Sequence, residues 1–310
     1  MTEIEITDIP PLRPDEQSLL AMHSLLNVFG VLRGELVMLG FSLADNDELL
    51  AGGLSRCDEW IASLRDPVAS LEGARRVEEY ARTMFAEIDA AIAAHPERSA
   101  DAGVADSVAN LHAAFDILQV RARELLARAR HPDGWESFSI TGLRQNFQNV
   151  FSAIEKNSHG RYRIIYNAAL QAARDYYVDF KLESSGGDNL IMPAVFQDVM
   201  RDLIANARKY TAPGGHITAA LYEDSDALRF LVQDTGRGIP EAELETVVHF
   251  GQRASNVSEV RTLGGGFGLT KAFLATKQFG GRFWLASQLA VGTRVRIHIP
   301  RPIAAPSAPR

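Results

Sequence analysis

Hydrophobic residues recur every three or four positions over roughly the first 130 residues, which is the spacing of amphipathic helices. The pattern predicts helices over residues 16–41, 67–94 and 104–130, with a shorter apolar segment at 57–64. Apolar positions in the first of these helices cover more than one side, which is more surface than a single neighbour can bury. We therefore expect an all-helical bundle, and a homodimer would bury both flanks of that helix.

The pattern changes after residues 131–134, whose sequence His-Pro-Asp-Gly is typical of a turn. Helices are expected near 141–157 and 193–210, with β-rich runs at 161–166 and 176–182. Two hairpins are also expected, with strands at 216–222, 228–233, 282–287 and 293–299. This mixture of helices and strands indicates an α/β domain after the helical one.

These patterns divide the chain into four expected segments. They are an N-terminal arm (1–14), a helical domain (15–131), an α/β domain (135–300) and a disordered tail (301–310). Prolines cluster in the arm and again in the tail, where they disfavour regular structure.

Composition narrows the class of protein. The net charge of −7 argues against a general nucleic-acid or membrane-surface binder. Cys57 is the single cysteine, which excludes an intrachain disulfide and a cysteine-built zinc site. No uninterrupted apolar run reaches the length of a membrane helix, and the acidic start is unlike a signal peptide. We therefore expect a cytoplasmic protein without membrane insertion and without a nucleic-acid partner.

One predicted helix, over residues 193–210, separates its polar and apolar residues sharply. At about 100° per residue, its polar face carries Asp198, Asp202, Asn206 and Lys209. Carboxylate and amide oxygens beside an ammonium group suit a hydrated Mg²⁺ ion next to phosphate. The same four residues would also suit a solvated helix face, so other motifs have to decide between the two.

Two glycine-rich stretches follow that helix. Residues 234–240, Asp-Thr-Gly-Arg-Gly-Ile-Pro, come at a strand end, where glycines let the backbone approach a planar ligand and a carboxylate can accept a hydrogen bond from an amine. Residues 264–271, Gly-Gly-Gly-Phe-Gly-Leu-Thr-Lys, open a helix whose free amides can bind phosphate. Their spacing is not that of a Walker A loop. Taken singly, the two stretches could be an ordinary turn and a flexible connector.

Taken together, the three stretches resemble the ATP-binding motifs of histidine-kinase-type ATPases. Residues 202–211 resemble the N box, 234–240 the G1 box and 264–269 the G2 box, in the family's order, and Phe250 with Gly251 resembles a shortened F box. The resemblance implies a Bergerat α/β sandwich, so the fold class expected is α+β, with an all-α dimerisation and phosphotransfer bundle before the ATP-binding domain.

The resemblance also implies the ligands, ATP and Mg²⁺, and a role for each motif residue. Asn206 would bind Mg²⁺, Lys209 would contact phosphate, Tyr210 would line the base or ribose pocket, and Asp234 would accept from the adenine amino group. The other implied nucleotide contacts are Gly236, Gly238, Gly264, Gly265, Gly266, Phe267, Gly268, Leu269 and Thr293. Residues 249–264 would form a lid, from which Arg253 or Arg261 would reach the γ-phosphate.

Asp202 stands where hydrolysing relatives have a glutamate that acts as general base and kinases usually have an amide. Aspartate has the carboxylate of the first group on a shorter side chain, so both a hydrolase and a kinase remain open. We assign Asp202 to the catalytic residues as a metal-shell or water-positioning group.

The resemblance also requires a phosphoacceptor histidine in the helical domain, and His23 is the best candidate. Asn27 follows one helical turn later, at the offset where the family places a residue for phosphatase chemistry. Ser24 and Val28 depart from the family pattern, which has an acidic residue and a proline there. A structural histidine at a polar seam is the alternative, and His112 is the rival phosphoacceptor.

The sequence therefore favours a soluble two-component histidine kinase that phosphorylates His23 and passes the phosphoryl group to a response-regulator receiver domain. Phosphatase activity is a further expectation, given Asn27. A Bergerat-fold ATPase that drives conformational change is one alternative, and a nucleotide-binding adaptor without kinase activity is another. Helices between about 54 and 130 exceed what a two-helix dimerisation domain needs.

Overall fold

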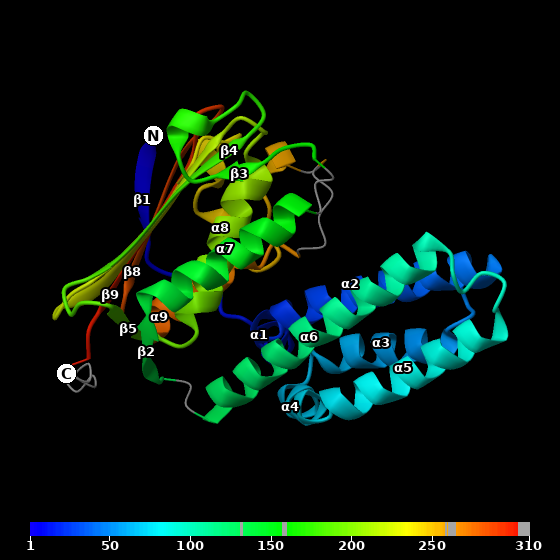
Figure 1. The fold of residues 1–310 in the computed structure, drawn as a ribbon. Coiled ribbons are helices and arrows are strands. Elements are labelled where there is room, and N and C mark those ends of the chain that lie inside the picture. Colours follow the sequence, from blue (N-terminus) through cyan, green and yellow to red (C-terminus); the bar gives the residue numbers. More distant parts are fainter. Residues whose placement is uncertain (131–132, 157–159, 258, 260–264, 303–310) are drawn as a thin grey trace. The chain divides into compact units, whose positions relative to one another are not determined.

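A computed structural model gives the fold and describes residues 1–130, 133–156, 160–257, 259 and 265–302 (Figure 1). The chain forms two compact units. Leu12–Pro132 make up the helical unit, while Met1–Pro11 and Asp133–Arg310 together make up the α/β unit. The expected boundary at His131 and Pro132 and most of the expected tail, 303–310, lie outside the described residues.

The helical unit is built from helices α1 to α6. Their bounds are α1 (Pro14–Ala21), α2 (His23–Ala44), α3 (Ala51–Ser63), α4 (Pro67–Arg75), α5 (Val77–Ala94) and α6 (Ala102–Arg130). Its core contains an aromatic cluster around Tyr80, whose ring lies 5.5 Å from Trp60 and 5.7 Å from Phe115 between centroids. Cys57 lies in this core, and burial raises the pKa of its thiol to about 11, consistent with a packing role.

Two helices predicted as continuous are each broken by one residue. The first is interrupted at Met22, which separates α1 from α2. The second, predicted over 67–94, is interrupted at Arg76 between α4 and α5. Both residues have φ near −100° and ψ near 0°, which shifts the helix axis without disturbing the apolar spacing. The hydrophobic pattern could therefore not reveal either break.

The α/β unit contains a mixed sheet of seven strands in the order β1-β8-β9-β7-β6-β4-β3. Strand β3 is parallel to β4 and β4 to β6, and the other neighbours are antiparallel. The strand bounds are β1 (Thr2–Ile6), β3 (Ile164–Ile165), β4 (Tyr176–Ser184), β6 (His216–Glu223), β7 (Ala227–Asp234), β8 (Arg282–Gln288) and β9 (Gly292–Pro300). The pairings β6–β7 and β8–β9 confirm the two predicted hairpins.

Helices α7 (Ile140–Lys156), α8 (Phe196–Tyr210) and α9 (Gly268–Gln278) cover one face of this sheet (Figure 1). Buried and less buried residues alternate along β4 and β6, as expected for strands with one face on the core. A separate antiparallel pair joins β2 (Trp135–Ser139) to β5 (Asn189–Pro193). This two-layer arrangement is the expected α/β sandwich.

The expected N-terminal arm includes a strand of the α/β unit. All five residues of β1 pair antiparallel with β8, at the edge of the sheet. Ile6 is buried in the sheet's core, and Glu5 accepts a hydrogen bond of 2.9 Å from the Arg282 guanidinium. The helical unit is thus inserted in sequence between the first strand and the rest of the α/β unit.

Helix α2 is long and apolar enough to cross a membrane, with a mean hydropathy of 1.4 over its window. It qualifies by average hydropathy, although Arg33 and Glu35 interrupt its apolar residues. Its buried residues, including Phe29, Leu32 and Leu36, belong to the core of the helical unit. Length and composition alone do not distinguish a membrane span from such a core helix.

Candidate functional site

The polar face of α8 meets helix α9 through a buried group of charges. The Lys271 ammonium lies 2.9 Å from an oxygen of Asp202 and 3.7 Å from an oxygen of Asp198. Asp198 also pairs with Arg201 one turn along its own helix. Only 8% of the Lys271 side chain and 6% of the Asp198 side chain are exposed. The structure therefore ties Asp202 to a cation carried by the second glycine stretch.

The start of α9 is packed directly on Asn206. A methyl group at Gly268 would lie 2.6 Å from the Asn206 amide nitrogen, so a larger residue there would displace the Asn206 side chain. The preceding Gly266 has φ of +78°, a conformation that favours glycine. The first amides of α9 thus lie beside an amide side chain that can bind a cation, which is an arrangement suited to phosphate together with a metal ion.

Asp234 ends strand β7 and is almost fully buried, with 7% exposure. One of its carboxylate oxygens accepts a hydrogen bond of 2.8 Å from the Gly236 amide and one of 3.3 Å from the Thr293 amide. Burial raises the pKa of Asp234 to about 6, and the two amides partly offset that rise. A buried carboxylate at a strand end is a suitable acceptor for an amino group of a planar ligand.

Glycines around Asp234 let three backbone segments meet. A methyl group at Gly236 would lie 2.5 Å from the Tyr210 carbonyl oxygen. Gly238 and Gly292 have φ of +69° and +131°, and a methyl group at either would overlap backbone atoms of Gln288 or Asp234. The first glycine stretch is therefore held against the ends of α8 and β8 by contacts that larger residues would disrupt.

The segment after the first glycine stretch is attached to that stretch. The Asn256 amide donates to the Gly238 carbonyl oxygen at 2.9 Å, and Arg253 donates to the Val257 carbonyl oxygen at 2.8 Å. The rings of Phe250 and Phe267 stack with centroids 4.7 Å apart. These contacts join the described part of the expected lid to both glycine stretches. Gly264 and Arg261, two predicted nucleotide contacts, lie outside the described residues.

The remaining predicted nucleotide contacts lie around this site. Lys209 and Tyr210 end α8, and the Lys209 ammonium lies 4.8 Å from the centre of the Tyr210 ring. Gly265 is held close to the Phe267 ring, and Leu269 lies in the first turn of α9, partly buried against the core. The α/β unit thus brings Asp202, Asn206 and Asp234 to one region through α8, β7 and the glycine stretches.

Comparison with known families identifies this region. Residues 193–303 match the family described as "Histidine kinase-, DNA gyrase B-, and HSP90-like ATPase". The chain carries a histidine-kinase-type ATPase domain. The match begins just before α8 and ends after β9, so it contains every nucleotide contact predicted from the sequence. The glycine stretches of this ATPase domain support ATP binding.

Relatives of the chain are histidine kinases. The adaptive-response sensory kinase SasA of Synechococcus elongatus is 30% identical over 178 residues, which cover 57% of this chain and 43% of the relative. The sensor histidine kinase WalK of Bacillus subtilis is 36% identical over 107 residues, or 33% of this chain and 17% of the relative. The aligned part of this chain spans less than half the length of these relatives.

The solved structures found to be similar to this chain include the nucleotide-free catalytic domain of histidine kinase ThkA. Its sequence is 18% identical, the comparison covers 54% of this chain and 97% of that domain, and the TM-score is 0.39.

A metal ion would have few protein ligands in the ATPase domain. Among the residues that the structure describes, no group of three or more His, Cys, Asp or Glu side chains could hold a metal ion. Mg²⁺ commonly binds through one or two protein oxygens together with substrate phosphates and water. Asn206 beside the start of α9 fits that mode of binding.

The predicted phosphoacceptor lies in the helical unit. His23 is the first residue of α2 and is 8% exposed. The Asn27 amide nitrogen lies 3.4 Å from its Nε2, which brings together the two residues predicted to share this site. His112 on α6 is exposed and stacks on Phe85. The break at Met22 therefore places His23 at a helix start, although its sequence context predicts the middle of a helix.

Sequence reasoning missed the role of Lys271 and the contact of Asp198 with it. A charged residue within the apolar stretch that begins α9 was the available signal, because a buried lysine requires a partner. Which partner it has depends on how α8 packs against α9, and that packing is not local in sequence.

Proposed function

We propose that the chain is a histidine kinase of a two-component system. In this proposal the ATPase domain transfers the γ-phosphoryl group of ATP to a histidine of the helical unit, and an aspartate of a response-regulator receiver domain then accepts it. The supporting observations are the close packing of the start of α9 on Asn206 and the buried acceptor Asp234 at the end of β7. Relatives of the chain are named sensory and sensor histidine kinases.

Within the ATPase domain, each residue has a separate task in this proposal. Asp234 accepts from the adenine amino group, and the amides at the start of α9 bind phosphate oxygens. Asn206 would hold Mg²⁺ together with the phosphates, and the bound ion would supply positive charge next to the γ-phosphoryl group. Lys209, on the last turn of α8, adds a positive charge near the phosphates. Catalysis is then mostly positioning and charge neutralisation.

His23 is the proposed acceptor. Its Nε2 attacks the γ-phosphorus, an N–P bond forms, the bond to the ADP oxygen breaks, and the imidazole proton passes to solvent. Because His23 is buried, the contacts around the α1–α2 junction must open before the phosphoryl group can reach it. The break at Met22 favours such a local opening, since α1 and α2 are separate helices. Asn27 lies where it can orient water for the reverse, phosphatase reaction.

The experiment is to incubate the chain with Mg²⁺ and γ-labelled ATP and to look for acid-labile, base-stable label. We expect His23→Ala to abolish the label. His112→Ala is the matched control, because His112 is also on a helix of this unit and is more exposed. Label that persists in His23→Ala would refute this acceptor, and loss in His112→Ala alone would move the assignment to His112.

Hydrolysis without phosphotransfer is the alternative, and Asp202 separates the two functions. A hydrolase would need its carboxylate as a general base. Here that carboxylate forms an ion pair with the Lys271 ammonium at 2.9 Å, so it is engaged by a cation of the protein. We expect Asp202→Asn to retain histidine labelling. Abolished ATP turnover would favour the hydrolase, and a nucleotide titration without binding would favour an adaptor.

We also propose that two copies associate through the helical unit. Large apolar side chains are exposed on α2 (Val31, Met38, Phe41) and on α6 (Ile117, Val120). The two helices are neighbours, since Asn110 on α6 donates to Glu35 on α2. A second copy would cover this face as a bundle of helices from both chains. We expect Met38→Glu with Phe41→Glu to give a monomer in sedimentation experiments; an unchanged mass would refute this interface.

A cytoplasmic location without membrane insertion is part of the proposal, since the apolar side of α2 is used by the core of the helical unit. Fractionation of cells that express the chain tests it, because recovery in the membrane fraction after a salt wash would contradict it.

A further inference from the structure

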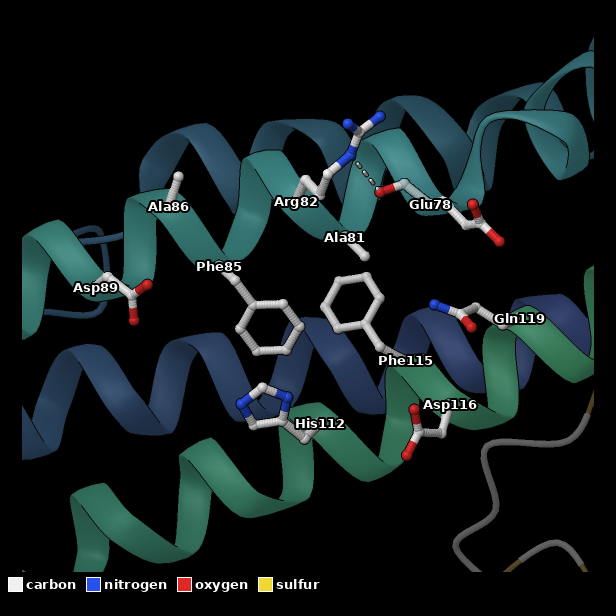
Figure 2. A pocket seen from close by; sticks show the side chains of 10 residues that line it. All are labelled: Glu78, Ala81, Arg82, Phe85, Ala86, Asp89, His112, Phe115, Asp116 and Gln119. Carbon is white, nitrogen blue, oxygen red and sulfur yellow. Dashed lines mark hydrogen bonds between the residues drawn. The ribbon is translucent and has the colours of Figure 1, made fainter.

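A groove of about 800 Å³ lies between α5 and α6 and is formed entirely by the helical unit. Figure 2 shows side chains of the two helices facing each other across it. On each helix the lining positions recur at intervals of three or four residues, so that one continuous face of α5 and one of α6 form its walls. None of these residues belongs to the ATP site or to the proposed phosphoacceptor pair.

Three aromatic rings meet in the groove. The imidazole of His112 stacks on Phe85 with 4.1 Å between ring centroids and an angle of 11° between the planes. Phe115 lies 5.0 Å from Phe85 in a tilted arrangement. Ala81 on α5 faces the Phe115 ring, whereas Ala86 points away from the three rings (Figure 2). Because Phe115 is only 2% exposed, the aromatic surface of the groove comes from His112 and from the half-buried Phe85.

The charges around these rings are mainly negative. Glu78, Asp89 and Asp116 contribute carboxylates, whereas Arg82 contributes the one guanidinium of the lining. Glu78 lies 3.7 Å from Arg123, but both side chains are more than 70% exposed, so this pair is weak. No ion pair involves Asp89 or Asp116 within the described part of the chain. These two carboxylates are thus available to an external cation.

We propose that this groove binds a small organic cation, an ammonium or guanidinium group carried on an apolar body. Aromatic faces attract cations, and the carboxylates of Asp89 and Asp116 supply the opposite charge at the edge of the rings. The volume is in the range of small-molecule sites, and the groove is open to solvent along the two helices. The inference is independent of kinase activity, because the helical unit alone provides the site.

The test uses the full chain and three probes with the same ring: benzamidine, which is cationic, benzamide, which is neutral, and benzoate, which is anionic. Binding is followed by NMR of the histidine ring protons, with the His112 signal identified by its loss in His112→Gln. We expect benzamidine to shift the His112 signal in a saturable way. Benzamide should bind about tenfold more weakly, and benzoate should not bind, because they lack the positive charge.

Variants separate the groove from general attraction to a negative protein. Asp116→Asn should weaken benzamidine binding about fivefold, as expected for the loss of one partly exposed charge partner. Asp106→Asn is the matched control on the same helix, exposed and outside the groove, and should leave the affinity unchanged.

Three results would overturn the proposal. They are equal affinity for benzamidine and benzamide, an equal effect of Asp106→Asn and Asp116→Asn, and no saturable shift with benzamidine up to about 20 mM.

Discussion

Replacing Lys271 by methionine tests whether the buried charge group organises the ATP site. The substitution keeps most of the apolar stem but removes the cation that lies 2.9 Å from Asp202 and 3.7 Å from Asp198. Removing one partner of a buried ion pair costs about 3–5 kcal/mol, because the remaining charge stays buried and unpaired. The Asp202 side chain is 23% exposed, and Asp198 still pairs with Arg201. We therefore expect the free energy of unfolding to fall by an amount near the lower end of that range.

A double-mutant cycle isolates this interaction. Asp202→Asn removes the charge that Lys271→Met leaves unpaired, so the double variant should be at least about 1 kcal/mol more stable than additivity predicts. Hydrogen exchange of the α8 and α9 amides measures the free energy of opening in the ATPase domain separately from the helical unit. A loss of about 3 kcal/mol corresponds to exchange about 150-fold faster for amides that exchange through unfolding of the domain.

Lys277→Met is the matched control, because Lys277 lies on the same helix but its ammonium rests over the Phe273 ring instead of pairing with a buried carboxylate. It should change the opening free energy by less than about 1 kcal/mol. Additive effects of Lys271→Met and Asp202→Asn, or equal effects at positions 271 and 277, would refute the reasoning.

Three further predictions concern the ATPase domain. Since burial raises the pKa of Asp234 to about 6, ADP affinity measured by calorimetry should fall as the pH drops below about 6 and the carboxylate loses its charge. Gly238→Ala should lower the free energy of unfolding, measured with urea, by about 1–3 kcal/mol more than Gly187→Ala does. Both glycines have positive φ, but only Gly238 has backbone atoms where the added methyl group would lie. Ile6→Ala should lower the free energy of unfolding of the α/β unit by about 2 kcal/mol in the same assay, because buried apolar surface at β1 is lost.

The Asp234 prediction has a second consequence for stability. The folded state binds this proton more tightly than the unfolded chain, so the group favours folding at low pH, and that contribution is lost as the pH rises from about 4 through 6. A pKa raised from about 4 to about 6 corresponds to about 3 kcal/mol of stability. Asp234→Asn should therefore stabilise the nucleotide-free domain at neutral pH while it weakens ADP binding. A destabilised variant, or a pH dependence of affinity that persists in it, would contradict this account.

The other two predictions also have outcomes that would contradict them. If Gly238→Ala and Gly187→Ala lowered the free energy of unfolding equally, the backbone around Gln288 would be able to move and admit a methyl group. For β1, Glu5→Gln should leave the unfolding midpoint unchanged, because its pair with Arg282 is exposed. If Glu5→Gln destabilised the domain as much as Ile6→Ala, the ion pair and not the buried side chain would hold the strand.

What the sequence predicted well depends on short-range patterns. Helix α8 was visible because its polar and apolar residues separate at helical spacing, and the glycine stretches were visible because their backbone requirements are local. The two hairpins followed from alternation and turn residues close in sequence. Local signals therefore sufficed for the motifs of the ATP site.

What the sequence did not reveal depends on contacts between distant residues. Strand β1 pairs with residues some 280 positions later. Residues 2–6 alternate between polar and apolar as a strand does, but nothing near them shows which strand they pair with. Lys271 finds Asp202 only when α8 and α9 pack together. The burial of His23 likewise results from packing within the helical unit, whereas its sequence context only places it on a helix. These features required the tertiary structure.

The pairing of β1 with β8 has a mechanical consequence for the kinase proposed here. The helical unit is covalently attached to the α/β unit twice, once before Leu12 and once near Asp133. A domain attached by two segments of chain has fewer ways to move than a domain on a single linker. If β1 left the sheet, only the segment near Asp133 would still anchor the helical unit to the folded α/β unit, and no residue of the ATP site would have changed.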